Sequence, residues 1–169
     1  MSVFFLSVSL LPKFQQVYAG DDVTLICNHK KEIKPTKWFI NGTRQSHQNY
    51  SMLLTTVTPK NNGKYQCDQS GQMSDPFNIT PHAQLSPSIG GAVMTKGDGR
   101  NLVLQVDDDL KDWACFALRK ESGFRLGHTP YSKNRAVVFA EFKGAERATF
   151  WCKKNGTTLR SNALTLKMT

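Results

Sequence analysis

The chain has 169 residues, of which 39% are hydrophobic and 21% are charged. This balance excludes a disordered chain, which combines high charge with too little apolar content to build a core. Its 22 Lys and Arg residues outnumber its 13 Asp and Glu residues, which gives a formal net charge of +9. The basic residues are scattered, however, and no dense basic run lies on a helix that reads nucleic acid. We therefore expect a solvated basic surface and no nucleic-acid partner.

Short runs of β-branched and aromatic residues, separated by turn residues, recur along the whole chain, and no segment keeps a helical period. This rhythm is typical of an all-β sandwich. In the first half it predicts strands over 3–10, 14–18, 21–28, 36–41, 51–57, 64–69 and 74–80. In the second half it predicts strands over 91–95, 100–106, 113–120, 124–127, 135–142, 147–153 and 159–168. Residues 6–10 alternate apolar side chains with serine, which favours a first strand over the alternative of a signal-peptide core.

The length allows either one large domain or two small ones. Four cysteines, two in each half, favour two small domains, since domains of this size often need a disulfide. Between Thr80 and Pro87 the chain holds two prolines and little periodic signal. We place the joint there, with one domain over residues 1–82 and the other over 83–169. The joint is too short to act as a flexible tether.

The first half carries two cysteines, a tryptophan and a tyrosine whose spacing is informative. Cys27 and Cys67 are 40 positions apart, Trp38 lies between them, and Tyr65 stands two residues before the second cysteine. This is the arrangement of an immunoglobulin sandwich, in which a disulfide joins the two sheets beside a buried indole. The tyrosine hydroxyl is then expected to bond back across a corner of the chain. A zinc site is the competing interpretation, but it requires closely spaced cysteine pairs, so we expect no metal and no cofactor.

The second half has a counterpart of the second cysteine of this pattern but none of the first. Val106 stands where the first cysteine is expected, and Phe150 replaces the corner tyrosine. The available cysteines are Cys115 and Cys152, whose strands are neighbours in one sheet of an immunoglobulin sandwich. Opposed inward residues on such strands lie about 5 Å apart, so we predict a non-standard disulfide between them. The alternative is a pair of free, buried thiols.

Four Asn-x-Ser/Thr sequons occur, at Asn41, Asn49, Asn78 and Asn155. Together with the cysteines they favour a glycosylated protein in an oxidising, extracellular setting. No apolar stretch approaches the ~20 residues that span a bilayer, so we expect no direct membrane insertion by this segment. The expected location is a cell-surface ectodomain or a secreted protein.

Motifs of catalytic sites are missing from the sequence: it holds no Gly-x-Ser-x-Gly, no His-Glu-x-x-His and no phosphate-binding loop. The histidines are scattered and adjoin no predicted nucleophile, so we expect no enzyme. Asp107, Asp108 and Asp109 suggest calcium, but consecutive carboxylates on a loop seldom converge on one ion. A solvated acidic loop is the favoured interpretation.

Two segments of the first half resemble the first domain of the leukocyte Fc receptors and their relatives. Gly20–Cys27 and Thr36–Gly42 follow that family's G-D/E-x-V-T-L-x-C and T-K-W-F-x-N-G patterns, and Gly63–Cys67 follows its G-x-Y-x-C. Val8–Pro12 is similar to its opening strand, and Ser74–Ile79 is similar to its last strand. The match covers residues 8–80 and is weak afterwards, which favours a distant member from a non-mammalian vertebrate.

The resemblance implies two tandem C2- or I-type immunoglobulin-like sandwiches with a short, bent joint. It also implies that the second domain binds immunoglobulin Fc through the joint, near His82 and Ala83, and through the loops after its second, third and sixth strands. Family members clamp an Fc proline between two tryptophans, and Trp113 would supply one of them, although it would equally fit the core. The candidate ligand contacts are Trp113, Asp107, Asp108, Asp109, Lys111, Arg119, Lys120, Lys153, Lys154 and Asn155.

The leading hypothesis is therefore the extracellular ligand-binding part of an immune receptor that binds immunoglobulin Fc. Signalling would then require further segments or a partner chain. The alternative is a related immune receptor or adhesion module for an MHC-like or other cell-surface protein, which the same fold would serve. A third hypothesis is glycosaminoglycan binding, which steep salt dependence would mark, by a basic cluster of Arg119, Lys120, Arg125, Lys153 and Lys154.

Overall fold

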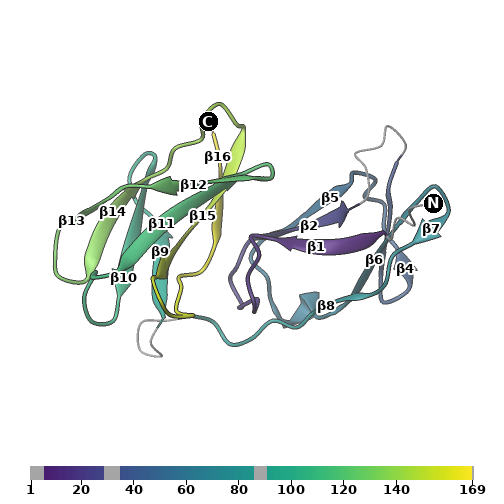
Figure 1. The fold of residues 1–169 in the computed structure, drawn as a ribbon, viewed down its shortest axis with the longest axis horizontal. Coiled ribbons are helices and arrows are strands. Elements are labelled where there is room, and N and C mark those ends of the chain that lie inside the picture. Colours follow the sequence, from purple (N-terminus) through teal and green to yellow (C-terminus); the bar gives the residue numbers. More distant parts are fainter. Residues whose placement is uncertain (1–5, 29–34, 86–90, 169) are drawn as a thin grey trace. The chain divides into compact units, whose positions relative to one another are not determined.

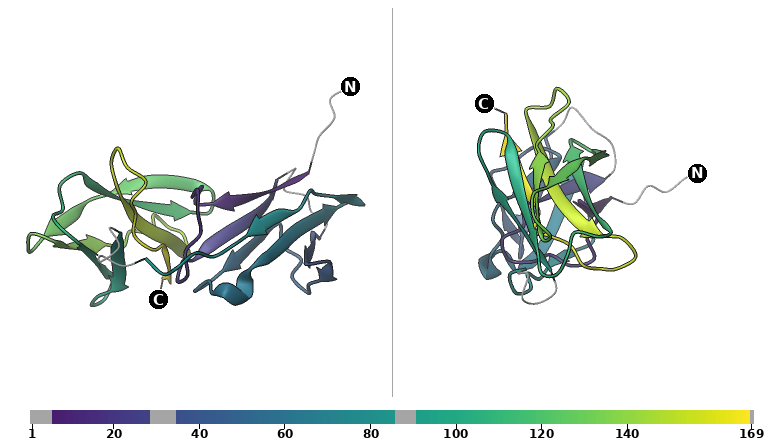
Figure 2. Two further views of the ribbon diagram at one scale, coloured as in Figure 1. Left: turned by 90° about the horizontal axis from the view of Figure 1, so that it is seen from below. Right: turned by 90° about the vertical axis from the view of Figure 1, so that its left-hand side faces the viewer.

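The computed structural model describes residues 6–28, 35–85 and 91–168 (Figure 1). Every regular element in these ranges is a strand, apart from one short 3-10 helix, η1 (Pro59–Asn61). Contacts divide the chain into two compact units. The first comprises Met1–Ala19 and Val23–His82, and the second comprises Gly20–Asp22 and Ala83–Thr169. In each unit two antiparallel sheets face each other (Figures 1 and 2). The fold is all-β, as predicted, with two immunoglobulin-like sandwiches in tandem.

The first unit pairs a three-stranded sheet with a larger one. The smaller sheet has the order β1-β2-β5, made of β1 (Ser7–Leu11), β2 (Val23–Asn28) and β5 (Ser51–Leu54). The larger sheet has the order β4-β3-β6-β7, and β8 also pairs with β6. Its strands are β3 (Lys37–Ile40), β4 (Thr43–Arg44), β6 (Gly63–Gln69), β7 (Gln72–Met73) and β8 (Phe77–Ile79).

The core of the first unit forms around a disulfide that joins its two sheets. Cys27 on β2 is bonded to Cys67 on β6, with their Cα atoms 6.0 Å apart. Trp38, opposite Cys67 on the neighbouring strand, is completely buried in the same cluster. Its indole Nε1 donates a hydrogen bond to the carbonyl oxygen of Asn49 at 2.7 Å, so the buried donor is satisfied. Alternation of buried Val8 and Leu10 with Ser7 and Ser9 supplies one face of β1.

A buried tyrosine closes the corner before β6. The Tyr65 hydroxyl donates a hydrogen bond to the carbonyl oxygen of Asn61 at 2.6 Å. The side chain is 1% exposed, and this burial raises the pKa of the Tyr65 phenol above its usual value, an effect that the hydrogen bond to Asn61 opposes. The structure thus contains the corner that the Tyr-x-Cys spacing predicts.

Replacing Tyr65 with phenylalanine is expected to destabilise the first unit by about 1 to 2 kcal/mol, because the Asn61 carbonyl loses its donor. The native chain should also lose stability above about pH 10, since a raised folded-state pKa favours the neutral phenol and this contribution disappears as the pH passes it. Tyr65→Phe should lack that component. Urea unfolding at neutral and alkaline pH measures both effects. The exposed Tyr131→Phe is the control, and an equal alkaline loss in Tyr65→Phe would contradict the assignment.

The second unit consists of two four-stranded sheets. One has the order β13-β14-β10-β9 and the other β12-β11-β15-β16. The first sheet contains β9 (Ala92–Lys96), β10 (Asn101–Val106), β13 (His128–Pro130) and β14 (Arg135–Phe139). The second contains β11 (Trp113–Arg119), β12 (Ser122–Leu126), β15 (Arg147–Lys154) and β16 (Leu164–Lys167).

The disulfide of the second unit lies within one sheet. Cys115 on β11 and Cys152 on β15 are directly opposed in the ladder, with their Cα atoms 3.9 Å apart. Val106 is 1% exposed and packs as ordinary core in the same cluster. Phe150 is completely buried, and its ring meets that of Phe142 edge-on at a centroid distance of 5.6 Å. Aromatic packing therefore takes the place of the tyrosine corner.

In both units a buried serine that follows the second cysteine forms the same pair of hydrogen bonds with it. In the first unit the Ser74 hydroxyl accepts from the Cys67 amide at 2.9 Å, and the Ser74 amide donates to the Cys67 carbonyl at 2.8 Å. In the second, Ser161 makes the same two bonds with Cys152, at 2.9 and 2.8 Å. The backbone amide and carbonyl of each of these buried cysteines are thereby hydrogen-bonded.

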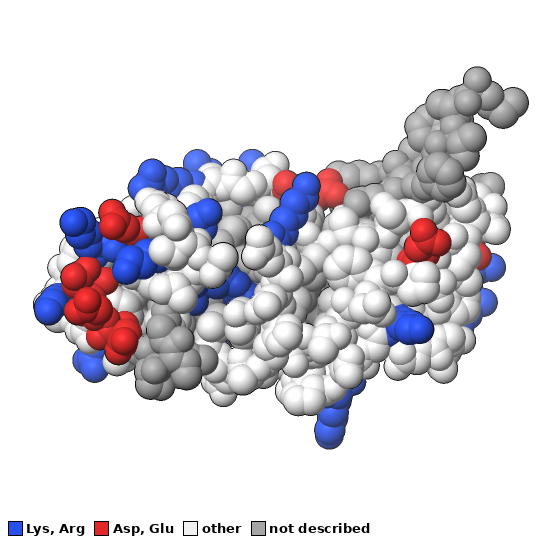
Figure 3. Space-filling view, turned by 60° about the horizontal axis from the view of Figure 1, so that its bottom comes forward, with Lys and Arg blue, Asp and Glu red and all other residues white. Residues whose placement is uncertain are grey.

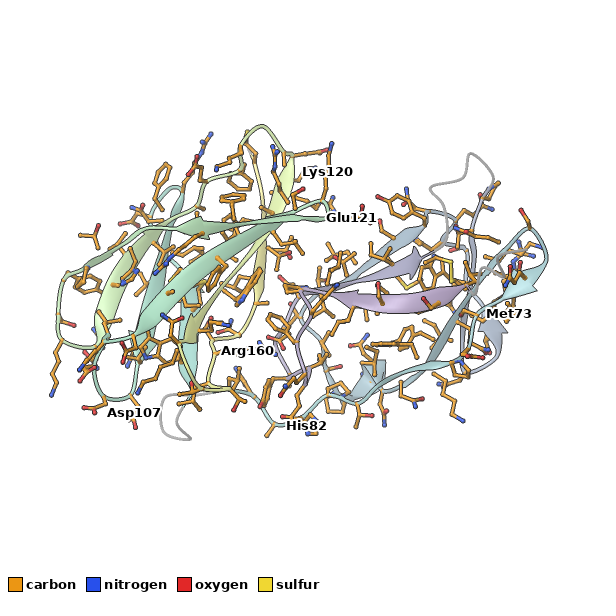
Figure 4. All side chains as sticks on the ribbon, viewed as in Figure 1. Met73, His82, Asp107, Lys120, Glu121 and Arg160 are labelled. Carbon is orange, nitrogen blue, oxygen red and sulfur yellow. A yellow bond between two sulfur atoms is a disulfide. The ribbon has the colours of Figure 1, made fainter. Side chains whose placement is uncertain are left out.

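The short segment Gly20–Asp22, which the sequence analysis assigns to the first domain, belongs to the second unit by its contacts. Asp21 is completely buried and forms a two-pronged ion pair with the guanidinium of Arg160, labelled in Figure 4. The two nitrogen–oxygen distances are 3.1 and 2.7 Å. The same carboxylate accepts from the Ala163 amide at 2.9 Å, so its charge is well compensated.

The observed strands differ from the predicted ones in several places. The strand predicted over 14–18 is wrong: Phe14 turns back to donate to the Pro12 carbonyl, and only Tyr18 forms a single bridge, to His82. Val17 is nevertheless 6% exposed, because it packs into the core without joining a ladder. The sequence analysis also missed the short strands β4, β7 and β13. Residues 3–5 of the predicted strand 3–10 lie outside the described residues.

No helix within the described ranges is both long and apolar enough to cross a membrane.

Candidate binding surface of the second unit

Three loops of the second unit meet at one end of its sandwich. We call this surface the loop end; it comprises residues 107–112, 131–134 and 154–157. The Asn155 amide donates to the Asp112 carbonyl at 2.8 Å, and the Leu110 amide donates to the Lys133 carbonyl at 3.1 Å. Val106, at the end of β10, donates to the Asn134 carbonyl at 2.9 Å. These backbone bonds join each loop to another, so the loop end forms one continuous surface.

Local turn chemistry fixes the shape of these loops. The Asp109 carboxylate accepts from the Lys111 amide at 2.9 Å, and the Trp113 amide donates to the Leu110 carbonyl at 3.2 Å. In the third loop the Thr157 hydroxyl donates to the Lys154 carbonyl at 2.9 Å. Gly156 has a φ of 76°, a conformation that favours glycine. The loops are therefore held by their own hydrogen bonds.

Charges of both signs lie on the loop end. Asp107, Asp108 and Lys111 are exposed, and Asp109 is partly exposed. Lys133 and Asp108 approach to 3.9 Å, but both side chains are more than 70% exposed, so their ion pair contributes little to stability. Figure 3 shows acidic side chains gathered at one end of the second unit with basic ones around them. Nowhere in the described ranges do three His, Cys, Asp or Glu side chains come together in a way that could hold a metal ion.

Trp113 does not lie on the surface, contrary to its choice as a candidate ligand contact. It is 6% exposed and belongs to the core cluster of the second unit. The reason is strand parity: β11 already begins at Trp113, so this residue faces inward with Cys115 and Ala117. Trp151 faces outward instead, as the position beside Cys152 predicts, and stacks on Phe116 at a centroid distance of 5.9 Å.

The remaining candidate contacts fall into two groups. Lys154 and Asn155 lie with the acidic loop at the loop end, and Lys153 directly precedes them on β15. Arg119 and Lys120 lie at the other end of β11, about 20 Å away for six residues of extended strand. There the Arg119 guanidinium donates to the Lys143 carbonyl, which lies 24 residues further along the chain. The structure does not bring the two groups together, nor does it gather the basic cluster considered for glycosaminoglycans.

Sequence reasoning missed the exposed aromatic residues of the second unit. Tyr131 is 55% exposed at the loop end, and Phe139 is 56% exposed at the far end of β14. The Tyr131 amide donates to the Arg135 carbonyl at 3.0 Å, which fixes the backbone while the ring stays in solvent. The turn residues Ser132, Lys133 and Asn134 after Tyr131 are the signal that could have placed this side chain at a hairpin tip.

All four sequon asparagines are exposed: Asn41, Asn49, Asn78 and Asn155. Asn155 belongs to the loop end. The Asn41 side-chain oxygen also accepts from the Lys64 amide at 2.9 Å. Exposure is a requirement for N-glycosylation, so each of these sites is sterically open to modification.

Comparison with known proteins places the chain in a class. Residues 6–80 match the family model "Immunoglobulin domain". The chain is 27% identical over 153 residues to the high affinity immunoglobulin epsilon receptor subunit alpha of Mus musculus, covering 86% of this chain and 58% of that protein. It is 37% identical over 79 residues to the low affinity immunoglobulin gamma Fc region receptor III-A of Bos taurus, covering 44% of this chain and 31% of that protein. The same receptor of Cavia porcellus is 36% identical over 80 residues, covering 45% of this chain and 32% of that protein.

The chain thus spans 58% of the mouse receptor and about a third of each of the other two relatives. A solved structure of the I9–I11 tandem from titin covers 94% of this chain and 63% of that chain, at 8% identity and a TM-score of 0.39, which is too low to add to the assignment. The fold, the inter-sheet disulfide and the matched domain define a protein of the immunoglobulin superfamily. Within that superfamily the sequence is similar to the extracellular regions of Fc receptors.

Proposed function

We propose that this chain is the extracellular part of an immune cell-surface receptor and that it binds immunoglobulin Fc. The similarity to receptors named for immunoglobulin epsilon and gamma Fc supports the ligand class. Two disulfides and four exposed sequon asparagines support an oxidising, extracellular location. Signalling would be carried by other segments or by a partner chain.

The proposed contact surface is the loop end of the second unit. The observation that carries this choice is Tyr131, a 55% exposed aromatic residue, among three hydrogen-bonded loops with charges of both signs. Tyrosine is enriched among residues that dominate interface energies, because it contributes a large, rigid area and a polar hydroxyl. Tyr131 takes the anchoring role that the sequence analysis gave to Trp113.

Replacing Tyr131 with alanine tests this proposal. The intact chain, expressed through a secretory pathway, is passed over immobilised immunoglobulins of each class from its own species. We expect Tyr131→Ala to weaken Fc binding by about tenfold or more, the usual cost of losing an aromatic anchor. Phe139→Ala is a matched control, because Phe139 is equally exposed on the same hairpin but lies away from the loop end.

The alternative ligand, an MHC-like or other cell-surface protein, gains support from a different face. Val103, Val137 and Phe139 lie on the outer face of the sheet that contains β10 and β14, where they form a partly exposed apolar strip. Fc binding that Phe139→Ala abolishes and Tyr131→Ala leaves intact would contradict the loop end as the contact. Absence of binding to every immunoglobulin class would contradict the ligand itself.

A further inference from the structure

The first unit has a polar pocket on the outer face of its larger sheet. Its volume is about 310 Å³, which lies at the lower end of the range for ligand sites and suits one sugar ring. It is lined by Pro35, Thr36, Lys37, Arg44, Gln48, Asp68, Ser70 and Gly71. No residue of the loop end takes part, because the pocket belongs to the other unit.

Strand parity places the charges of this pocket on one face. Trp38 faces the core, so Lys37 faces outward, and Asp68 stands opposite it on β6. Arg44 on β4 pairs with Phe39, two residues after Lys37, and therefore shares the same outer face. Two cations from neighbouring strands thus border a single hollow, where one carboxylate also lies.

The carboxylate of this pocket already accepts one hydrogen bond, whereas its two cations have no ion-pair partner among the described residues. The Asp68 carboxylate accepts from the Gly71 amide at 3.1 Å, in the hairpin turn between β6 and β7. Neither Lys37 nor Arg44 forms an ion pair with any other residue that the structure describes. The pocket therefore carries a net positive charge that an anionic group would neutralise.

Backbone and side-chain oxygen atoms complete the pocket. Ser70 and Gly71 have φ values of 54° and 83°, as a tight two-residue hairpin requires, so Gly71 presents bare backbone at the wall. Thr36 is 1% exposed, and its hydroxyl oxygen accepts from the Gln69 side-chain amide at 3.0 Å. Because Thr36 lies on the same inward side of the chain as Trp38, this hydroxyl is buried and is not available to a ligand. Asp68 and Gln48 offer oxygen atoms to donors.

We propose that this pocket binds a carboxylate-bearing sugar at the end of a glycan. Arg44 and Lys37 would take the carboxylate, since a guanidinium matches its two oxygens and an ammonium adds charge. Asp68 and Gln48 would accept from the ring hydroxyls. A simple phosphate or sulfate would use the cations and leave those acceptors idle, and for this reason the chemistry favours an acidic sugar. The site is open to solvent on one side, so the affinity is on the order of millimolar.

Amide chemical shifts of the isotope-labelled intact chain test the proposal. The probes are 3′-sialyllactose, a disaccharide that ends in glucuronic acid, and uncharged lactose. We expect either acidic probe to shift the amide signals of Thr36 and Gly71, and lactose to leave them in place. Binding by the sialylated probe alone would identify a sialic acid as the source of the carboxylate, and binding by the other alone would identify a uronic acid.

Variants then locate the site. Arg44→Gln and Lys37→Gln should each weaken binding by about tenfold or more, the usual cost of losing a hydrogen bond to a charged group. Lys64→Gln, an exposed lysine on β6 outside the pocket, should bind like the native chain. Three results would overturn the proposal: no response to either acidic sugar, an equal response to lactose, or unchanged binding in Arg44→Gln. Each is independent of Fc binding, which is measured on the other unit.

Discussion

Replacing Cys115 and Cys152 together with alanine is expected to lower the free energy of unfolding of the second unit by about 4 kcal/mol. The bond closes a loop with a sequence separation of 37 residues, and chain-entropy arguments assign about that stabilisation to a loop of this length. Both side chains are completely buried within the core cluster, so the change also removes packed sulfur atoms. For a domain of about 85 residues, such a loss is a large part of its total stability.

Hydrogen exchange of the β11 and β15 amides in the intact chain measures this effect, because it follows the second unit separately from the first. The matched comparison is Cys27→Ala with Cys67→Ala, whose sequence separation of 40 predicts a similar loss confined to the first unit. A thiol titration of the denatured, unreduced native chain should find no reactive thiol. Two reactive thiols, or unchanged exchange in β11 and β15, would show that the intra-sheet bond does not hold this domain together.

The sequence alone was sufficient for the features that strand parity controls. Once Cys27, Trp38, Tyr65 and Cys67 are recognised as inward positions, the two sheets and the corner follow from the immunoglobulin pattern. The same reasoning gives the pairing of the second domain, because the Cys115 and Cys152 strands are neighbours in that pattern and Val106 cannot form a disulfide. The structure contains both of these disulfides.

The candidate site was less predictable because it depends on where strands begin and how loops turn. Trp113 was named both as a ligand contact and as a core residue, and it is buried because it shares the inward face of β11 with Cys115. Arg119 and Lys120 were grouped with the loop end although a whole strand separates them from it. Tyr131 was overlooked because β13, the strand that leads to it, has only three residues, His128–Pro130, and shows no apolar period of two. The pocket around Arg44 follows from β4, a strand of only two residues.

A second large effect is expected from the buried ion pair of the second unit. Replacing Arg160 with methionine leaves the Asp21 carboxylate buried without its cation, and breaking a buried pair in this way costs about 3 to 5 kcal/mol. Adding Asp21→Asn should recover much of this loss. The amide is neutral and its oxygen can still accept from Ala163, whose amide donates to Asp21 at 2.9 Å in the native chain.

Lys167→Met is the control, since Lys167 and Glu146 form an ion pair at 3.5 Å with side chains 64% and 73% exposed. An exposed pair of this kind contributes at most about 0.5 to 1 kcal/mol, because water screens both charges. Exchange of the β15 amides should therefore accelerate strongly in Arg160→Met, little in Lys167→Met and moderately in the double variant. Equal effects of Arg160→Met and Lys167→Met would mean that Asp21 is hydrated in solution, and the buried pair would then have no special role in holding Gly20–Asp22 to the second unit.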